Sequence, residues 1–274
     1  MESTTAQMEA HVPAKASTST GLLAEAGELT AFGGRSLAAI GGTPRYASEV
    51  LRQAAMMIRG TWFLMLAMNM FLGMSLVNFG FFFLRSIGAS DFLGLTSGYV
   101  SIRQLAPTMF GYVFCAKVCC GMAAEIGAMK TNEEIDAYDS TGVDPLRYVV
   151  GTRLVAVLLF MPLATGLALI GQIAGAYLDS VIILQGIAPN VLMDVHWGVQ
   201  TARDQLNTFL TICVLGVMCS LVAMFYGLRA TGGPAGVGTA SARSIYVNLI
   251  LVHIIAGLMF VFFYGTDLHL PIGG

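Results

Sequence analysis

Five long stretches with almost no charge constrain the fold of this chain more than any other feature. They cover approximately residues 61–84, 99–123, 150–178, 207–228 and 245–265. The hydrocarbon core of a bilayer is about 30 Å thick, which about 20 helical residues cross at ~1.5 Å per residue. Each stretch is long enough, so we expect an all-α integral membrane protein with five transmembrane helices.

Charged residues are few and unevenly distributed along the chain. They make up 11% of the 274 residues, compared with roughly 25% in soluble domains. Ten of them lie in residues 1–60 and nine in residues 125–153. This composition excludes a soluble enzyme, a disordered protein and a nucleic-acid-binding protein, and the formal net charge of −2 indicates no polyanionic partner.

The N-terminal part of the chain is polar before it becomes amphipathic. Residues 1–44 predict a polar cytoplasmic segment, without structure over 1–20 and weakly helical over 22–41. In residues 45–60, apolar side chains recur at three- and four-residue steps. The opposite face holds Arg45, Arg52 and Arg59. This pattern is typical of an amphipathic helix in the membrane interface, with its arginines toward lipid headgroups; a helix packed against the cytoplasmic part of the protein is the alternative.

The distribution of Lys and Arg predicts the orientation, because these residues are retained on the cytoplasmic side. With five spans, one set of flanks holds ten of them, and the opposite set holds only Arg85 and Arg203. The ten are Lys15, Arg35, Arg45, Arg52, Arg59, Lys130, Arg147, Arg153, Arg229 and Arg243. We therefore expect the N-terminus in the cytoplasm and the C-terminus outside.

Residues 125–147, between the second and third predicted spans, are strongly acidic. The acids are Glu125, Glu133, Glu134, Asp136, Asp139 and Asp144, against two bases, Lys130 and Arg147. An anionic membrane surface would repel such a segment, whereas a soluble protein with a basic groove would bind it as a helix in a groove. We expect a cytoplasmic coupling helix that transmits force from such a partner to the spans; a solvated loop helix without a special role is the alternative.

Residues near both ends of this helix predict its bounds. Thr131 followed by Glu134 matches a capping box, which begins a helix. Gly142 and the pair Asp144-Pro145 are typical of its end. The product is a short helix of two or three turns. Its small apolar face consists of Ile135 and Tyr138.

Three runs in and around the acidic segment carry a family resemblance. They are Ala124-Glu125-Ile126-Gly127-Ala128-Met129-Lys130, Glu133-Glu134-Ile135-Asp136-Ala137 and Val143-Asp144-Pro145. Together they resemble the coupling region of the MlaE/YrbE permeases, the membrane subunits of ABC lipid transporters that work with MCE-domain proteins. Outside this region, the run Gly232-Gly233-Pro234-Ala235-Gly236-Val237-Gly238 is similar to the glycine-rich cytoplasmic loop of the family.

The resemblance covers roughly residues 45–265 and implies a permease domain over 45–274. Such a permease is one subunit of an ATP-driven transporter that moves lipids or fatty acids across the cell envelope from the plasma (inner) membrane. The implied partners are a second YrbE-type permease subunit, a cytoplasmic ABC ATPase dimer and a hexamer of MCE-domain proteins. The long polar N-terminus is most similar to actinobacterial YrbE subunits of Mce systems. A membrane scaffold that anchors MCE proteins without transporting lipid is the alternative function.

The resemblance and the acidic segment together define the residues expected to couple the ATPase to the membrane. In the family the short acidic helix docks into a groove on the ATPase. The expected coupling residues are Glu125, Glu133, Glu134, Asp136, Ala137, Tyr138, Asp144 and Pro145.

Arg103 and Lys117 are charged residues within the second predicted span, where a charge is costly and often functional. They are fourteen residues apart, which in an α-helix places them within about 40° of each other and roughly 21 Å apart. We expect them to contact lipid headgroups or carboxylates at the two ends of a translocation path; snorkelling to the two interfaces is the alternative. Gln104 stands where the family usually has Glu, so any salt bridge of Arg103 to that acid is lost.

The remaining motifs argue against catalysis in this chain. None of its lysines completes a phosphate-binding G-x-x-x-x-G-K-[ST] loop, so ATP hydrolysis is expected in a separate subunit. Cys115, Cys119 and Cys120 lack a fourth ligand at suitable spacing, so we expect no metal and no cofactor. The predicted spans contain no Asp or Glu, which disfavours an ion-coupled secondary transporter. Gly171 and Gly175 form a GxxxG motif, which permits close helix packing.

Overall fold

The computed structural model describes residues 18–265, and every regular element in this range is a helix. Most of the predicted unstructured tail, residues 1–17, and the C-terminal residues 266–274 lie outside the described part. The α-helices are α1 (Thr18–Ala39), α2 (Ala47–Ser86), α3 (Ala106–Phe114), α4 (Cys120–Thr131), α5 (Glu134–Ser140), α6 (Thr152–Tyr177), α7 (Pro189–Gly198), α8 (Ala202–Leu228) and α9 (Gly233–Tyr264). The 3₁₀ helices are η1 (Ile40–Tyr46) and η2 (Ser90–Leu93), and the π-helices are η3 (Thr96–Leu105), η4 (Cys115–Cys119), η5 (Leu146–Gly151) and η6 (Leu178–Ile183).

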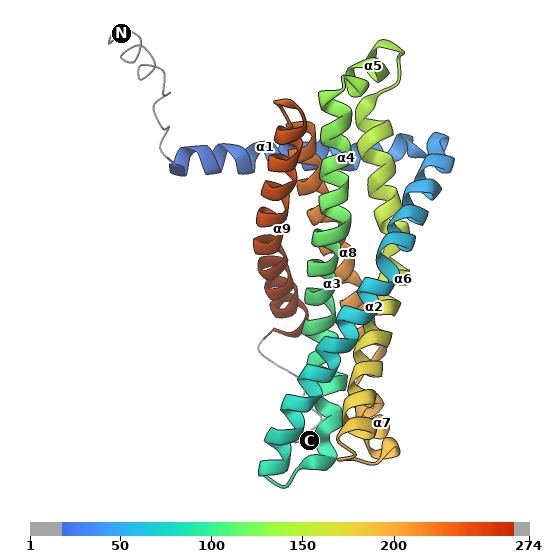
Figure 1. Ribbon diagram of the computed structural model, residues 1–274, viewed down its shortest axis with the longest axis vertical. Coiled ribbons are helices and arrows are strands. Elements are labelled where there is room, and N and C mark those ends of the chain that lie inside the picture. Colours follow the sequence, from blue (N-terminus) through green and yellow to red (C-terminus); the bar gives the residue numbers. More distant parts are fainter. Residues whose placement is uncertain (1–17, 266–274) are drawn as a thin grey trace, which may run out of the picture.

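Five helical segments in residues 18–265 are long and apolar enough to cross a membrane, as the sequence predicted. They are Ala24–Ser86, Ser90–Thr131, Leu146–Ile183, Ala202–Leu228 and Gly233–Tyr264. In Figure 1 the long helices run side by side along the longest axis of the molecule, with α5 at one end and α7 at the other. The all-α, five-span fold is therefore confirmed, and the two ends of the bundle differ in what they carry.

The N-terminal helices are arranged differently from the sequence-based expectation. Residues 47–60 do not form a helix of their own; they are the first turns of α2, which continues without interruption into the first span. The helix that crosses the bundle near its α5 end is α1 (Figure 1). The 3₁₀ helix η1, which contains Pro44, connects α1 to α2, because proline interrupts regular α-helical hydrogen bonding.

The second span changes its winding twice, at the π-helical stretches η3 and η4. Arg103 lies in η3 and Lys117 in η4. A π-helix closes its hydrogen bonds over five residues instead of four, so the angular offset expected from straight α-helical spacing does not apply to this pair.

The most extensive helix contact among the described residues is that of α2 with α6, and glycines on both helices allow their backbones to approach closely. A Cβ atom on Gly171 would lie 2.7 Å from the carbonyl oxygen of Leu66, and one on Gly175 would overlap the carbonyl oxygen of Met70. Reciprocally, a Cβ atom on Gly73 would overlap the carbonyl oxygen of Gln172. The close packing predicted from the GxxxG motif is confirmed.

Candidate coupling site

The acidic segment leaves the bundle at a sharp turn between α4 and α5. The Thr131 hydroxyl donates to the carbonyl oxygens of Gly127 (3.1 Å) and Ala128 (3.0 Å), one turn back in α4. Thr131 therefore belongs to the end of α4, and the predicted capping box with Glu134 is wrong. Glu133 makes the turn with a φ of 61°, a left-handed conformation that is uncommon for a residue other than glycine.

The C-terminal end of α5 lies where the sequence predicted it. Gly142 has a φ of 76°, and the backbone N–H of Val143 donates to the carbonyl oxygen of Tyr138 at 3.0 Å. Asp144 then accepts a hydrogen bond of 2.9 Å from the backbone N–H of Leu146, so it also begins the next helix. Gly142 and Asp144-Pro145 end α5 as predicted.

The two faces of α5 have opposite environments. Ile135 is buried in the hydrophobic core of the bundle. The ring of Tyr138 packs on Tyr148 with centroids 4.9 Å apart, and Tyr148 in turn packs on Tyr46 at 5.2 Å. The apolar face predicted for this helix therefore attaches α5 to the bundle. The exposed face includes Glu133, Glu134, Asp136 and Ala137.

In the part of the chain that the structure describes, ion pairs balance Asp136 and the following Asp144, but not Glu133 or Glu134. Asp136 pairs with Lys130 at 3.0 Å, and Asp144 pairs with Arg147 at 3.0 Å. Glu133 and Glu134 form no ion pair within residues 18–265; Glu134 accepts only a long hydrogen bond of 3.5 Å from the Asn132 amide. Among the acids whose side chains the structure describes here, Glu133 and Glu134 at the start of α5 carry negative charge that no ion pair balances.

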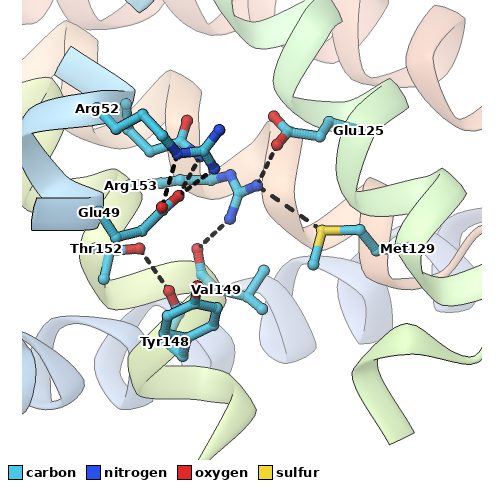
Figure 2. A network of polar contacts seen from close by, with 9 residues as sticks. Glu49, Arg52, Glu125, Met129, Tyr148, Val149, Thr152 and Arg153 are labelled. Atoms are coloured by element: carbon cyan, nitrogen blue, oxygen red, sulfur yellow. Dashed lines mark hydrogen bonds and ion pairs between the residues drawn. The ribbon is translucent and has the colours of Figure 1, made fainter. Parts of the chain in front are cut away.

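Beneath α5, an ion pair joins α4 to α6. Arg153 Nη2 lies 2.7 Å from Glu125 Oε1, with the Arg153 side chain 5% exposed and that of Glu125 44% exposed. In Figure 2 the guanidinium of Arg153 lies between Glu125, the carbonyl group of Val149 and the sulfur of Met129. From the sequence, Arg153 was expected only to contribute to the orientation of the chain. It is the one arginine within the predicted span 150–178, and a buried arginine usually has a carboxylate partner.

A second charged group on α2 lies next to this pair (Figure 2). Arg52 donates to Glu49 at 2.7 and 2.8 Å, and the amide of Gln53 donates to the same carboxylate at 2.8 Å. A cleft lined by Glu49, Glu134, Tyr138 and Arg153, among others, separates this group from α5. The coupling helix is thus bordered by side chains from α2, α4 and α6.

Arg103 lies toward the opposite end of the bundle and is deeply buried. Its Nε is 3.0 Å from Asp204 Oδ1, and both side chains are only 6% exposed. The guanidinium lies over the rings of Tyr99 (3.7 Å) and Tyr264 (4.5 Å). Asp204 also forms a capping box with Thr201 that begins α8. Asp204 is therefore the acid that pairs with Arg103. The motif Thr201-x-x-Asp204 could have predicted the start of α8, but not this pair.

Lys117 is placed apart from Arg103. Its side chain lines a cleft between α2, the second span and α6 whose volume is about 200 Å³.

Two acids are buried within the helical segments that could cross the membrane, although the predicted spans contained none. Asp179 lies in Leu146–Ile183 and Asp204 in Ala202–Leu228, just beyond the predicted span limits. The helices extend beyond the apolar stretches, and the acids in these extensions are buried inside the bundle. Residues 18–265 hold no group of three or more His, Cys, Asp or Glu that could bind a metal.

Comparison with known proteins agrees with this architecture. The family model described as Permease MlaE matches residues 50–262. A probable ABC transporter permease of Synechocystis sp. is 30% identical over 61% of this chain and 63% of its own length. The Arabidopsis thaliana protein TRIGALACTOSYLDIACYLGLYCEROL 1, chloroplastic, is 26% identical over 65% of this chain and 51% of its own length. A probable ABC transporter permease of Rickettsia typhi is 28% identical, over 55% and 58% respectively.

These matches span less than two thirds of each relative's own length. The family model, in contrast, covers most of the described helices, from the first turns of α2 to the last turn of α9. This chain belongs to the MlaE permease family.

Proposed function

We propose that this chain is the permease subunit of an ATP-driven lipid transporter, and that α5 is where a separate cytoplasmic ATPase binds. The observation that carries this proposal is the two-sided environment of α5. Ile135 and Tyr138 fix the helix to the bundle, while Glu133 and Glu134 face outward and carry no counter-ion within the described residues. A basic groove on the ATPase would complement this first turn.

The connections of α5 provide a route for force. The helix is joined to α4 through Asn132 and Glu133 and to η5 through residues 141–145. The ion pair Glu125–Arg153 connects α4 to α6 directly below it. A displacement of α5 by the ATPase would therefore move the second and third spans together.

The remaining parts of the transporter are inferred from the family. We expect two permease subunits to pair, because five helices rarely enclose a path for a lipid, with the ATPase dimer on the α5 side and MCE-domain proteins on the α7 side. The excess of Lys and Arg on the α5 side supports placing that side in the cytoplasm, the C-terminus outside, and the chain in the plasma membrane. The resemblance in the long N-terminus supports a YrbE subunit of an Mce system.

A reversal of charge at Glu134 tests the coupling role. Glu134 is exposed, so Glu134→Lys should fold normally and should abolish both co-purification of the ATPase and uptake of radiolabelled oleate by cells that produce the whole transporter. Asp91→Lys is a matched control, because Asp91 is also exposed but lies in η2, away from α5. Intact association and uptake in Glu134→Lys would overturn the proposal.

The same experiment separates the permease from a scaffold that only anchors MCE proteins. A scaffold needs no ATPase, so Glu134→Lys would leave its function intact. Loss of oleate uptake while the MCE assembly still co-purifies in full would exclude the scaffold.

A further inference from the structure

We propose that the cleft beside Lys117 binds the anionic headgroup of a membrane lipid. The cleft lies between α2, the second span and α6, and its volume is about 200 Å³. Pockets that enclose a whole drug-sized ligand measure about 300–1,000 Å³. This cleft is smaller than that range, so it can take only a part of a lipid, such as the anionic group, while the rest of the lipid stays in the bilayer.

Lys117 supplies an available positive charge. No carboxylate within residues 18–265 pairs with it, although the chain pairs Arg103, Lys130 and Arg153. Its side chain is exposed and passes close to Gly60 of α2, where an added Cβ atom would lie 3.7 Å from Lys117 Cε. An exposed cation on a membrane-spanning helix attracts an anionic headgroup.

Two buried hydrogen-bond donors belong to residues that line the cleft. Within residues 18–265, Thr61 Oγ1 and Arg153 Nε have no hydrogen-bond partner, and both residues line the cleft. Both atoms are covered from solvent, so a headgroup would reach them by displacing the neighbouring side chains. A helical threonine usually donates to the carbonyl oxygen one turn earlier, so the free hydroxyl of Thr61 is unusual. Buried polar groups without partners are rare, and each calls for an explanation; a bound anion that accepts from both groups is one. Phosphate or carboxylate oxygens accept from Lys, Arg and Thr alike.

The other walls of the cleft fit an acyl chain. Met56, Met57 and Met122 line it, and Met56 is exposed at its edge. Methionine side chains are flexible and adapt to apolar ligands of irregular shape. Glu125 also lines the cleft, but its charge is balanced by Arg153. The lining as a whole is thus positively charged and apolar, which matches an anionic lipid better than a neutral one.

Arg153 and Glu125 also line the separate cleft below α5. A headgroup that hydrogen-bonds to Arg153 Nε would therefore touch the same ion pair that connects the coupling helix to the bundle. The lipid site does not depend on the ATPase, so it can be tested without ATP, and its failure would leave the proposed coupling role unaffected.

The test measures lipid retention by native mass spectrometry of the purified full-length protein in detergent. Three probes separate the sources of the anion: phosphatidylglycerol, diacylglycerol with the same chains but no charge, and inorganic phosphate. We expect phosphatidylglycerol to remain bound and the other two to be lost. Lys117→Met should reduce phosphatidylglycerol retention about fivefold, the change that corresponds to about 1 kcal/mol for one basic contact. Equal retention of diacylglycerol, or full displacement of phosphatidylglycerol by inorganic phosphate, would overturn the assignment to an anionic lipid.

Two further variants separate a built site from general attraction to the surface. Arg59→Met removes a neighbouring exposed cation of α2 that does not line the cleft, and it should leave retention unchanged. Thr61→Val removes the unpartnered hydroxyl at almost constant volume. This variant should abolish the rise in melting temperature that phosphatidylglycerol gives to the wild-type protein. Equal losses in Arg59→Met and Lys117→Met, or an undiminished lipid effect in Thr61→Val, would contradict the proposal.

Discussion

Arg153 of α6 and Glu125 of α4 form an ion pair of 2.7 Å in which the two partners are buried to very different extents, 5% exposed for the arginine and 44% for the glutamate. An unpaired charge is costly when it is buried and cheap when water reaches it. Removing Glu125 should therefore lower the free energy of unfolding by a different amount than removing Arg153.

We predict that Glu125→Ala destabilises the protein more than Arg153→Met. Glu125→Ala leaves the buried guanidinium without its counter-ion and should cost about 3–5 kcal/mol. Arg153→Met leaves a carboxylate that is partly hydrated, so the cost should be about 1 kcal/mol. Thermal unfolding of the purified variants in detergent compares the two. Equal shifts in melting temperature would mean that the burial difference has no energetic consequence.

We predict that the packing of α5 against the bundle can be weakened without changing its acidic residues. Ile135 is buried, and Ile→Ala substitutions in a core cost about 2–5 kcal/mol. Because α5 has only seven residues, this loss should free the helix locally without unfolding the bundle. Hydrogen exchange measured by mass spectrometry should then become faster over residues 132–145 and stay unchanged in α8. Ala137→Ser, on the exposed face, is the control; unchanged exchange in Ile135→Ala would show that Ile135 does not hold the helix.

The sequence was sufficient to predict the features that depend on local patterns. The five spans follow from long apolar stretches, and the end of α5 follows from Gly142 and Asp144, which act on their own neighbours. The start of α5 was predicted wrongly because the Thr131 hydroxyl can either cap the helix that follows it or donate to carbonyl oxygens of the helix that precedes it. The Thr131 hydroxyl bonds backward into α4, and nothing in the run itself distinguishes the two.

Features that depend on distant residues were not predicted. Arg103 was expected to contact lipid headgroups or carboxylates at one end of a translocation path, but its partner could not be named. That partner, Asp204, lies in a different helix, and the two meet through the packing of α8 on the second span. Arg103 and Lys117 also lie in the π-helical stretches η3 and η4, where α-helical spacing does not hold. Periodicity assumes a uniform helix, so it could not place these two side chains relative to each other.

The stability of the α7 end should depend on pH through His196. Burial lowers the pKa of this imidazole from about 6.5 to about 4, and its Nδ1 lies 2.9 Å from the Ser97 hydroxyl. Between these two pH values the unfolded chain binds a proton that the folded protein does not, so stability rises with pH across this window. At about 1.36 kcal/mol per pKa unit, the lowering of the pKa from about 6.5 to about 4 gives a total change of at most about 3.4 kcal/mol.

Unfolding midpoints measured from pH 4 to pH 7 test this dependence. His196→Gln keeps a polar group of similar size but does not titrate, so it should flatten the profile. A slope that persists unchanged in His196→Gln would assign the pH dependence to other groups.

Replacing either of two glycines of α6 by alanine should change the stability of the protein in opposite directions. A Cβ atom on Gly175 would overlap the carbonyl oxygen of Met70, whereas one on Gly166 meets nothing within 4 Å. Gly175→Ala must push α2 and α6 apart, at a cost of about 1–3 kcal/mol, as is typical of overpacking. Gly166→Ala only improves helix propensity and should stabilise the protein by up to about 1 kcal/mol. Melting temperatures in detergent should therefore fall for Gly175→Ala and stay level or rise for Gly166→Ala. If both variants shifted in the same direction, helix propensity and not backbone contact would govern the α2–α6 interface.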